Sequence, residues 1–515
     1  MRVKRALAAL AGAWGVGVMS PAPALAHGFG ERYDLPLPLW MYLVGAGATV
    51  ALSFVVIGIF VKAAPGRYRY PRHNLRAHGW FRGIFESRLF LLTVQALSVG
   101  LYALVIATGL FGNEAPVLNF APPFVWIIWW VGMAYVSALL GNLWALVNPW
   151  SILFSWVERL YTRLTGDQGL SLEFNYPGWL GVWPGVVFFF AWAWLENAYP
   201  DPAAPRTIAV LTIGYSLITW GGMLLFGRHH WLRHGEAFSL LFGFLARFAP
   251  TEARVVDSER CQECDLGCGY GDGECVDCYQ CYELAGDDRQ LNLRPYAVGL
   301  GLPVPVGVDT LAFVVMMLST VTFDGFRATP AWVTLGSAIH SLFSSMGLIG
   351  SVVAESIGMG LFIGVFLGVY LIFCRVMGAV SGDSRSGVEL ARSFVFSIIP
   401  IAIGYHLAHY FGYLAIQGQL MIPLVSDPFG AGWDLFGTSG YQVSVGVVNV
   451  KFIWFLSVAA IVIAHIVAVY LSHIVSFRAF PVPSMALRSQ YPMLALMVGY
   501  TMTSLWIIAQ PIVGK

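Results

Sequence analysis

Charged side chains are scarce along this chain of 515 residues. Asp, Glu, Lys and Arg together make up 11% of the residues, while hydrophobic residues make up 57%. A soluble globular domain carries roughly 25% charged residues, so this composition excludes a soluble protein and is typical of a chain that crosses a membrane several times. No basic patch of the kind that binds nucleic acid interrupts the apolar segments, and a nucleic-acid partner is excluded on that ground.

The common catalytic motifs are absent as well. The sequence contains no phosphate-binding glycine loop, no G-x-S-x-G nucleophile elbow, no H-E-x-x-H motif and no C-x-x-C-H haem-attachment motif. It therefore gives no sign of ATP use, of hydrolysis or of covalent haem. Whether the protein is an enzyme is left open.

Apolar segments of membrane-spanning length recur about ten times, at roughly 20 residues per span. We predict an all-α polytopic membrane protein with about ten transmembrane helices and a cysteine-rich loop. Residues 27–227 are predicted as a first membrane block of about five spans, residues 228–306 as the loop, and residues 307–515 as a second block of about five spans. The predicted spans lie near residues 38–61, 89–112, 123–147, 182–198, 207–227, 307–326, 352–378, 393–416, 451–477 and 492–511.

The first 26 residues have the features of a secretory signal peptide. Arg2, Lys4 and Arg5 form a basic start, an apolar stretch follows, and the A-L-A sequence at 24–26 matches a signal-peptidase cleavage site. Cleavage there would leave His27 at the mature N-terminus, outside the cytoplasm. An uncleaved first helix is the alternative.

The distribution of Lys and Arg between the connections predicts the orientation. The connection after the first span contains seven basic residues, and the long loop at 228–306 contains seven Arg, whereas residues 417–449 contain no Lys or Arg. Cytoplasmic loops carry the excess of positive charge. We therefore predict a multi-pass protein of the cell inner (plasma) membrane, with both mature termini outside and the cysteine loop in the cytoplasm.

Six of the chain's seven cysteines lie within 21 positions of the predicted loop, at C-x-x-C spacing and with glycines between them. A short turn between two thiolates lets both bind one tetrahedral ion. Cytoplasmic thiols stay reduced, which favours metal or iron–sulfur ligation over disulfides; an inverted topology would favour disulfides. The predicted ligands are Cys261, Cys264, Cys268, Cys275, Cys278 and Cys281.

The spacing is compatible with two kinds of centre. The C-x-x-C pairs beginning at Cys261 and Cys275 would form a zinc knuckle, and the C-x-x-C-x-x-C run ending at Cys281 could hold an iron–sulfur cluster. No Cys-Pro closes the run, and the acidic neighbours favour a cation over an anionic cluster. We predict a transition-metal cofactor, which is zinc, copper or an iron–sulfur cluster.

Histidines within the spans form a second candidate site. His406 and His409 share one helix face, and His465 lies at similar depth in the next span. An ionisable side chain inside the membrane is a functional candidate, and these three are predicted to bind haem, copper or zinc, or to pass protons. Hydrogen bonding between helices is the structural alternative. Among the carboxylates, Asp324 and Glu355 are the deepest candidates for lining an ion path.

Two function classes follow. The first is an integral membrane metal-ion permease or metal-handling protein, with a histidine site in the membrane and a thiolate site in the cytoplasm. The alternative is a transmembrane redox protein that carries an iron–sulfur centre and haem. The expected partners are membrane lipid and a metal ion, and the sequence identifies no protein partner.

Overall fold

The computed structural model describes residues 35–61, 70–167, 169–256, 259, 261, 264, 268–270 and 274–513. The predicted signal peptide at residues 1–26, and His27, lie outside the described residues. All six clustered cysteines lie within them.

Ten helical segments of the described chain are long and apolar enough to cross a membrane, which confirms the predicted fold class. Each overlaps one predicted span. They are α2 (Leu39–Phe60), α4 (Arg88–Phe111), α5 to α6 (Ala121–Leu139), η4 and α9 (Gly178–Asn197), α10 (Pro205–Phe226), α15 (Val308–Arg327), η7 and α17 (Ser344–Ser381), α18 to α20 (Gly387–Ser426), α21 (Val450–Ala479) and α22 (Pro483–Val513).

Several of these segments are built from shorter elements. Their components are α5 (Ala121–Pro123), the π-helix η3 (Phe124–Gly132), α6 (Met133–Leu139), α9 (Trp183–Asn197), α17 (Gly347–Ser381), α18 (Gly387–Phe394), α19 (Ile399–Gln417) and α20 (Met421–Ser426). The shorter helices between spans are α3 (Gly79–Phe85), α7 (Trp144–Val147), α8 (Pro149–Thr165), α11 (Arg228–His234), α12 (Ala237–Ala246), α14 (Tyr279–Leu284) and α16 (Pro330–Leu342).

The spans divide into a buried centre and a lipid-facing periphery. In the most apolar window of α4 only 6% of the residues are buried inside the protein, whereas 72% are buried in the window of the segment that contains α19. An apolar helix surface that other helices do not cover contacts lipid tails, because the interior of a membrane consists of hydrocarbon. α19 and α15 therefore form the centre of the bundle, and it is there that polar side chains can be shielded from lipid.

The central helix α19 packs closely against α21. A Cβ atom at Gly404 would lie 2.8 Å from the backbone carbonyl oxygen of Ala460 and would also collide with Ala464. Small residues let helix backbones approach in a membrane, where dispersion contacts replace the hydrophobic effect as the source of helix association. Glycine at position 404 thus fixes the distance between the two helices.

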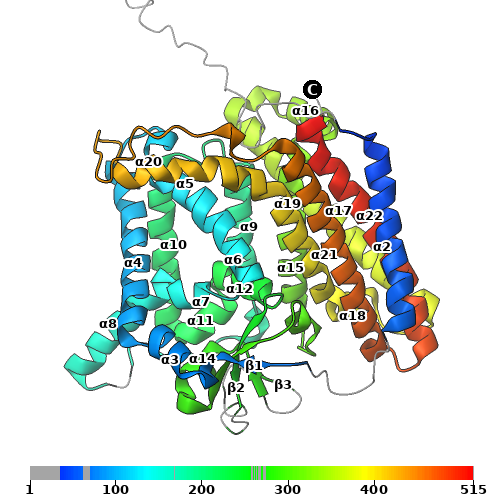
Figure 1. The fold of residues 1–515 in the computed structure, drawn as a ribbon, viewed down its shortest axis with the longest axis horizontal. Helices are drawn as coiled ribbons and strands as arrows, with labels where there is room; N and C mark the ends of the chain where they lie inside the picture. The colour runs from blue at the N-terminus through cyan, green and yellow to red at the C-terminus, as the bar shows by residue number, and fades with distance from the viewer. Residues whose placement is uncertain are drawn as a thin grey trace, which may run out of the picture.

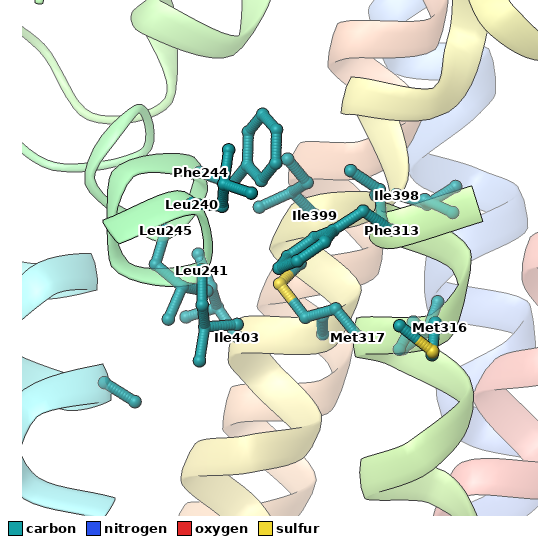
Figure 2. Packing of buried hydrophobic residues seen from close by; sticks show 14 of the residues in the cluster. Leu240, Leu241, Phe244, Leu245, Phe313, Met316, Met317, Ile398, Ile399 and Ile403 are labelled. Carbon is teal, nitrogen blue, oxygen red and sulfur yellow. The ribbon is translucent and has the colours of Figure 1, made fainter. Parts of the chain in front are cut away.

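A short helix inside the predicted loop belongs to the bundle core. α12 is apolar apart from Ser239 in its first turn, and it buries Leu240, Leu241, Phe244 and Leu245. The Phe244 ring lies 5.6 Å from the Phe313 ring of α15, and Ile399 and Ile403 of α19 lie beside the side chains of α12 (Figure 2). At ten residues α12 is too short to span a bilayer, and its sequence gives no span signal.

The cysteine loop folds onto a small antiparallel sheet. Its strands are β1 (His73–Asn74), β2 (Thr251–Val255), β3 (Gly269–Tyr270), β4 (Glu274–Val276) and β5 (Arg289–Leu293), in the order β1-β5-β2-β4-β3. Strand β1 comes from the connection between α2 and α4, so the sheet joins two loops that are far apart in the sequence.

The sheet and α16 lie at opposite ends of the bundle (Figure 1). Helix α2 begins, and α22 ends, at the same end as α16 (Figure 1). Any chemistry at the two ends is therefore separated by the length of the spanning helices.

Candidate metal centre and polar vestibule

The β3–β4 hairpin brings the first cysteines together. Gly269 is paired with Cys275 across the hairpin, and Cys268 immediately precedes Gly269. The Sγ atoms of Cys268 and Cys275 consequently lie 2.7 Å apart. Strand β4 is held in turn by β2, where Val255 is paired with Cys275.

A turn after β4 directs the next cysteines to the same place. Asp277 has φ +56°, a left-handed conformation in which Asp is among the more tolerant residues. Its backbone N–H donates to the Ala253 carbonyl at 2.7 Å, and its carboxylate accepts from the Ala253 N–H at 3.1 Å. The chain then enters α14 with Cys278 at its N-cap and Cys281 one turn later, so both thiols face the hairpin.

The six cysteines form two groups that share one member. The ligand atoms of Cys264, Cys268, Cys278 and Cys281 lie within 4.8 Å of one another, and so do those of Cys261, Cys275 and Cys281. Five of the side chains are buried and Cys264 is half-buried. All six are free thiols. The cluster can hold a metal ion, and Cys281 belongs to both groups.

The spacing of the four-thiol group suits a single ion. Four sulfur atoms bound tetrahedrally at about 2.3 Å lie about 3.8 Å from one another. The Cys268–Cys281 distance is 3.4 Å and the Cys264–Cys278 distance is 3.9 Å. In a 4Fe–4S cluster each thiolate binds a different iron atom, so the sulfurs must stand farther apart.

Burial and close packing of the thiols disfavour the ionisation of most of them. Burial raises the pKa of Cys281 to about 12, and a hydrogen bond from the Cys281 thiol to Cys264 adds to the effect. Hydrogen bonds from the Cys268 and Cys275 thiols lower the pKa of Cys278. One thiolate is therefore stabilised by its neighbours, but several require a cation between them.

A buried ion-pair network fixes the cysteine centre to the bundle. Glu252 on β2, 1% exposed, accepts from Arg294 at 2.9 Å, from Arg72 at 2.6 Å and from the Tyr70 hydroxyl at 2.6 Å. Arg294 also contacts Asp277 at 3.6 Å and donates to the Ala246 carbonyl at the end of α12. Burial raises the pKa of the Glu252 carboxyl, but the charge of Arg294 and the hydrogen bond from Tyr70 bring that pKa below its ordinary value.

At the opposite end of the bundle lies a polar vestibule of about 1160 Å³. It is bordered by η3, α9, α15, α16, α17 and α19, and by the turn after α9. Its polar lining includes Glu196, Asn197, Asp324, Arg327, Glu355 and Tyr410. Asp324 and Glu355, the carboxylates predicted to lie deepest, thus both face this vestibule.

Polar contacts connect the vestibule lining to α19. His409 Nε2 lies 2.8 Å from Asp324 Oδ2, and the Tyr410 hydroxyl lies 2.8 Å from the same oxygen. Tyr410 also lies 3.1 Å from Glu196 Oε1, which accepts from the Trp130 indole at 3.0 Å. Both the histidine and Asp324 are more than nine-tenths buried, at 7% and 9% side-chain exposure.

The three predicted membrane histidines do not converge. His409 contacts Asp324 on α15, and the His406 ring lies 5.4 Å from the Tyr135 ring on α6. His465 Nδ1 donates to the Ile461 carbonyl at 2.8 Å, and its ring lies 5.8 Å from that of Tyr500 on α22. Among the described residues, no group of three metal-ligating side chains includes any of them. Periodicity placed them at similar depth but could not show that each faces a different helix.

Sequence reasoning missed the partners that organise both sites. Glu236, completely buried, caps α12 through the Phe238 and Ser239 amides, and Glu252 and Arg294 hold the cysteine centre. The one available signal was the position of Glu236 directly before a short apolar run, which is a helix N-cap pattern.

The fold and the site together define a class: a multi-pass, helical membrane protein with a cysteine cluster that can hold a metal ion. Comparison of the chain with protein-family models, with curated protein sequences and with solved structures finds no match to a family, a relative or a fold.

Proposed function

We propose that this chain is a membrane metal-handling protein that moves a divalent transition-metal cation, Zn²⁺ in the first instance, across the bilayer. The observation that carries the proposal is the four-thiol group of Cys264, Cys268, Cys278 and Cys281, whose sulfur separations suit one tetrahedral ion. We assign the metal to the cysteines alone.

The exposure of the cysteine centre supports metal exchange. Cys264 is half-buried, whereas Cys268, Cys278 and Cys281 are at most 3% exposed. Solvent therefore reaches the group on the side of Cys264, and an incoming ligand could displace that sulfur first. A fully enclosed group would favour a permanently held structural ion.

The two-ended arrangement supports transport. The vestibule is lined by residues of α16, and the cysteine centre is built on the sheet. α16 and the sheet lie at opposite ends of the bundle (Figure 1). A carrier of metal ions needs a polar approach on one side and a tighter binding site on the other. The redox alternative has less support, because the sulfurs are too close for a 4Fe–4S cluster and the histidines do not face one another.

Orientation follows from the arginine-rich loops, and we place the cysteine centre in the cytoplasm. An alkaline phosphatase fusion after Gly286 should be inactive and a green fluorescent protein fusion there should fluoresce, because only the latter matures in the cytoplasm. Paired fusions after Gly440, in the connection without basic residues, should behave in the opposite way. Phosphatase activity at Gly286 would contradict the orientation.

Transport is tested by obstructing the vestibule. Ser337 is exposed on α16 and borders the vestibule, so Ser337→Trp should fill part of the approach without disturbing a buried contact. We expect Zn²⁺ uptake by proteoliposomes, followed with a trapped zinc indicator, to fall at least about tenfold, which corresponds to a barrier increase of about 1.4 kcal/mol.

A matched control lies on the same helix. Leu335 is 50% exposed and does not border the vestibule, so Leu335→Trp should leave uptake unchanged. If neither the wild-type protein nor the control carries Zn²⁺ above the rate of empty liposomes, the transport proposal is wrong. Equal uptake by both variants would instead exclude the vestibule as the route.

A further inference from the structure

One hydroxyl group joins two carboxylates in the vestibule. The Tyr410 oxygen lies 2.8 Å from Asp324 Oδ2 and 3.1 Å from Glu196 Oε1. A phenol has one proton to donate, and an ionised carboxylate can only accept. If both acids were ionised, one of these two short contacts would bring two oxygens together with no hydrogen between them. One acid must therefore carry a proton.

The surrounding groups do not remove this requirement. Arg327 is the nearest cation on α15, and its Nε lies 3.4 Å from Glu355 on α17, which balances its charge. Trp130, on η3, donates to Glu196 as a neutral group. On α19, His409 contacts Asp324, and His406, Tyr405 and Tyr413 are the other titratable groups of that helix near the pair. His340 on α16, and Tyr199 and Asp201 in the turn after α9, border the same vestibule. Two carboxylates bridged by one hydroxyl repel each other when both are charged.

The geometry points to a proton-binding relay formed by Glu196, Tyr410, Asp324 and His409. In one form Glu196 is the acid and donates its O–H to the Tyr410 oxygen, while Tyr410 donates to ionised Asp324. In the other form Asp324 is the acid and donates its O–H to the Tyr410 oxygen, while Tyr410 donates to ionised Glu196.

Passing from the first form to the second moves one proton from Glu196 to Asp324. The Glu196 O–H bond breaks as the Tyr410 oxygen gains that proton, and the tyrosine's original O–H bond breaks as Asp324 gains the other. Tyr410 is neutral before and after, and no side chain has to move. In both forms His409, 2.8 Å from Asp324 Oδ2, donates its Nε2–H to that oxygen.

The vestibule connects the relay with water. Asn197 is next to Glu196, is 2% exposed and borders the vestibule. Its amide nitrogen donates to the Ala193 carbonyl at 2.9 Å, but its Oδ1 has no hydrogen-bond partner within the described residues. A buried acceptor of this kind is costly unless a donor such as water occupies the space beside it. Water bound to Asn197 lies at the residue that directly follows Glu196, the first acid of the relay.

A proton that moves along the relay supplies the proposed transporter with its coupling ion. This role rests on the proposed function, whereas the presence of the shared proton does not. Infrared difference spectroscopy of the full chain in detergent tests the proton directly. At neutral pH we expect a C=O stretching band of a protonated carboxylic acid that shifts in D₂O.

Single substitutions identify the band as a shared proton. Either Glu196→Gln or Asp324→Asn should abolish it, because the new amide can donate to Tyr410 and the remaining acid then ionises. Glu114→Gln, an exposed position outside the vestibule, should leave the band unchanged. Absence of the band in the wild-type protein, or its persistence in either single variant, would overturn the relay.

Coupling is tested in the same proteoliposomes that report Zn²⁺ uptake. An outward proton gradient should accelerate Zn²⁺ uptake at least about tenfold relative to no gradient, and this acceleration should be lost in Tyr410→Phe. Zn²⁺ uptake that is indifferent to the gradient would refute coupling while leaving transport intact. A carboxylic acid band without any Zn²⁺ uptake would support the relay and refute the proposed transport.

Discussion

Replacing Cys281 with serine is expected to empty the metal centre. Cys281 is the only cysteine, among those described, that belongs to both thiol groups, so its loss leaves neither group complete. Removing a hydrogen-bond partner of a metal ligand already weakens binding by 10–100-fold, and removing the ligand itself should weaken it by at least about 100-fold. Elemental analysis of anaerobically purified Cys281→Ser should find less than about a tenth of the wild-type metal content.

The seventh cysteine provides the control. Cys374 is completely buried on α17 and belongs to neither group. Cys374→Ala removes a sulfur atom from the protein without touching the cluster, and the metal content should stay at the wild-type level. Retention of metal by Cys281→Ser would show that the ion is bound by residues other than this cluster.

The second large effect concerns the buried ion pair that anchors the cysteine centre. Glu252→Ala leaves Arg294, 4% exposed, without its closest carboxylate. Removing one partner of a buried pair costs about 3–5 kcal/mol, because the other charge remains desolvated. Amide hydrogen exchange in β2 and β5 should therefore become about 100-fold faster or more, while exchange in α19 and α21 should change little.

An exposed ion pair in the same loop is the comparison. Glu283 pairs with Arg228 at 2.6 Å but is 48% exposed, so Glu283→Ala should cost less than about 1 kcal/mol. Similar costs for the two substitutions would contradict the anchoring role of Glu252. Because the pKa of Glu252 is lower in the folded protein, its contribution is complete above its unfolded pKa of about 4.3 and is lost as the pH falls through the folded value.

The spans could be predicted because lipid imposes one rule along the whole length of each helix. A run of about 20 apolar residues in a protein of this composition predicts a transmembrane helix, because a helix satisfies all its backbone hydrogen bonds within the segment. α12 escaped prediction for the same reason: Ala237–Ala246 is apolar but too short to span, and only its contacts with α15 and α19 show that it is core. The sheet could not be predicted from the sequence either, since β1 has two residues and its partner β5 lies more than 200 positions away.

The candidate sites show the same limit. C-x-x-C spacing predicted that the six thiols gather, but it did not predict how they divide. The pairs Cys261/Cys264 and Cys275/Cys278 are each split between the two thiol groups, and only Cys278 and Cys281 stay in one group. The helical period predicted that His406 and His409 share one helix face. Both lie on α19, but the period carries no information about the neighbouring helices, and the two rings contact different ones. Asp324 and Glu196, which give His409 and Tyr410 their partners, come from α15 and α9. Only the packing of these helices brings the four side chains together.

The central claim is that four cysteine sulfurs hold a transported metal ion, and X-ray absorption at the zinc edge tests it most directly. The full chain, purified anaerobically after growth with zinc, should contain about one ion per chain with an all-sulfur shell at about 2.3 Å. The Cys264→Ser variant, prepared in the same way, should have fewer sulfur neighbours around the zinc and should show oxygen or nitrogen in the shell. A wild-type protein that contains no metal, or a shell dominated by oxygen and nitrogen, would contradict the account.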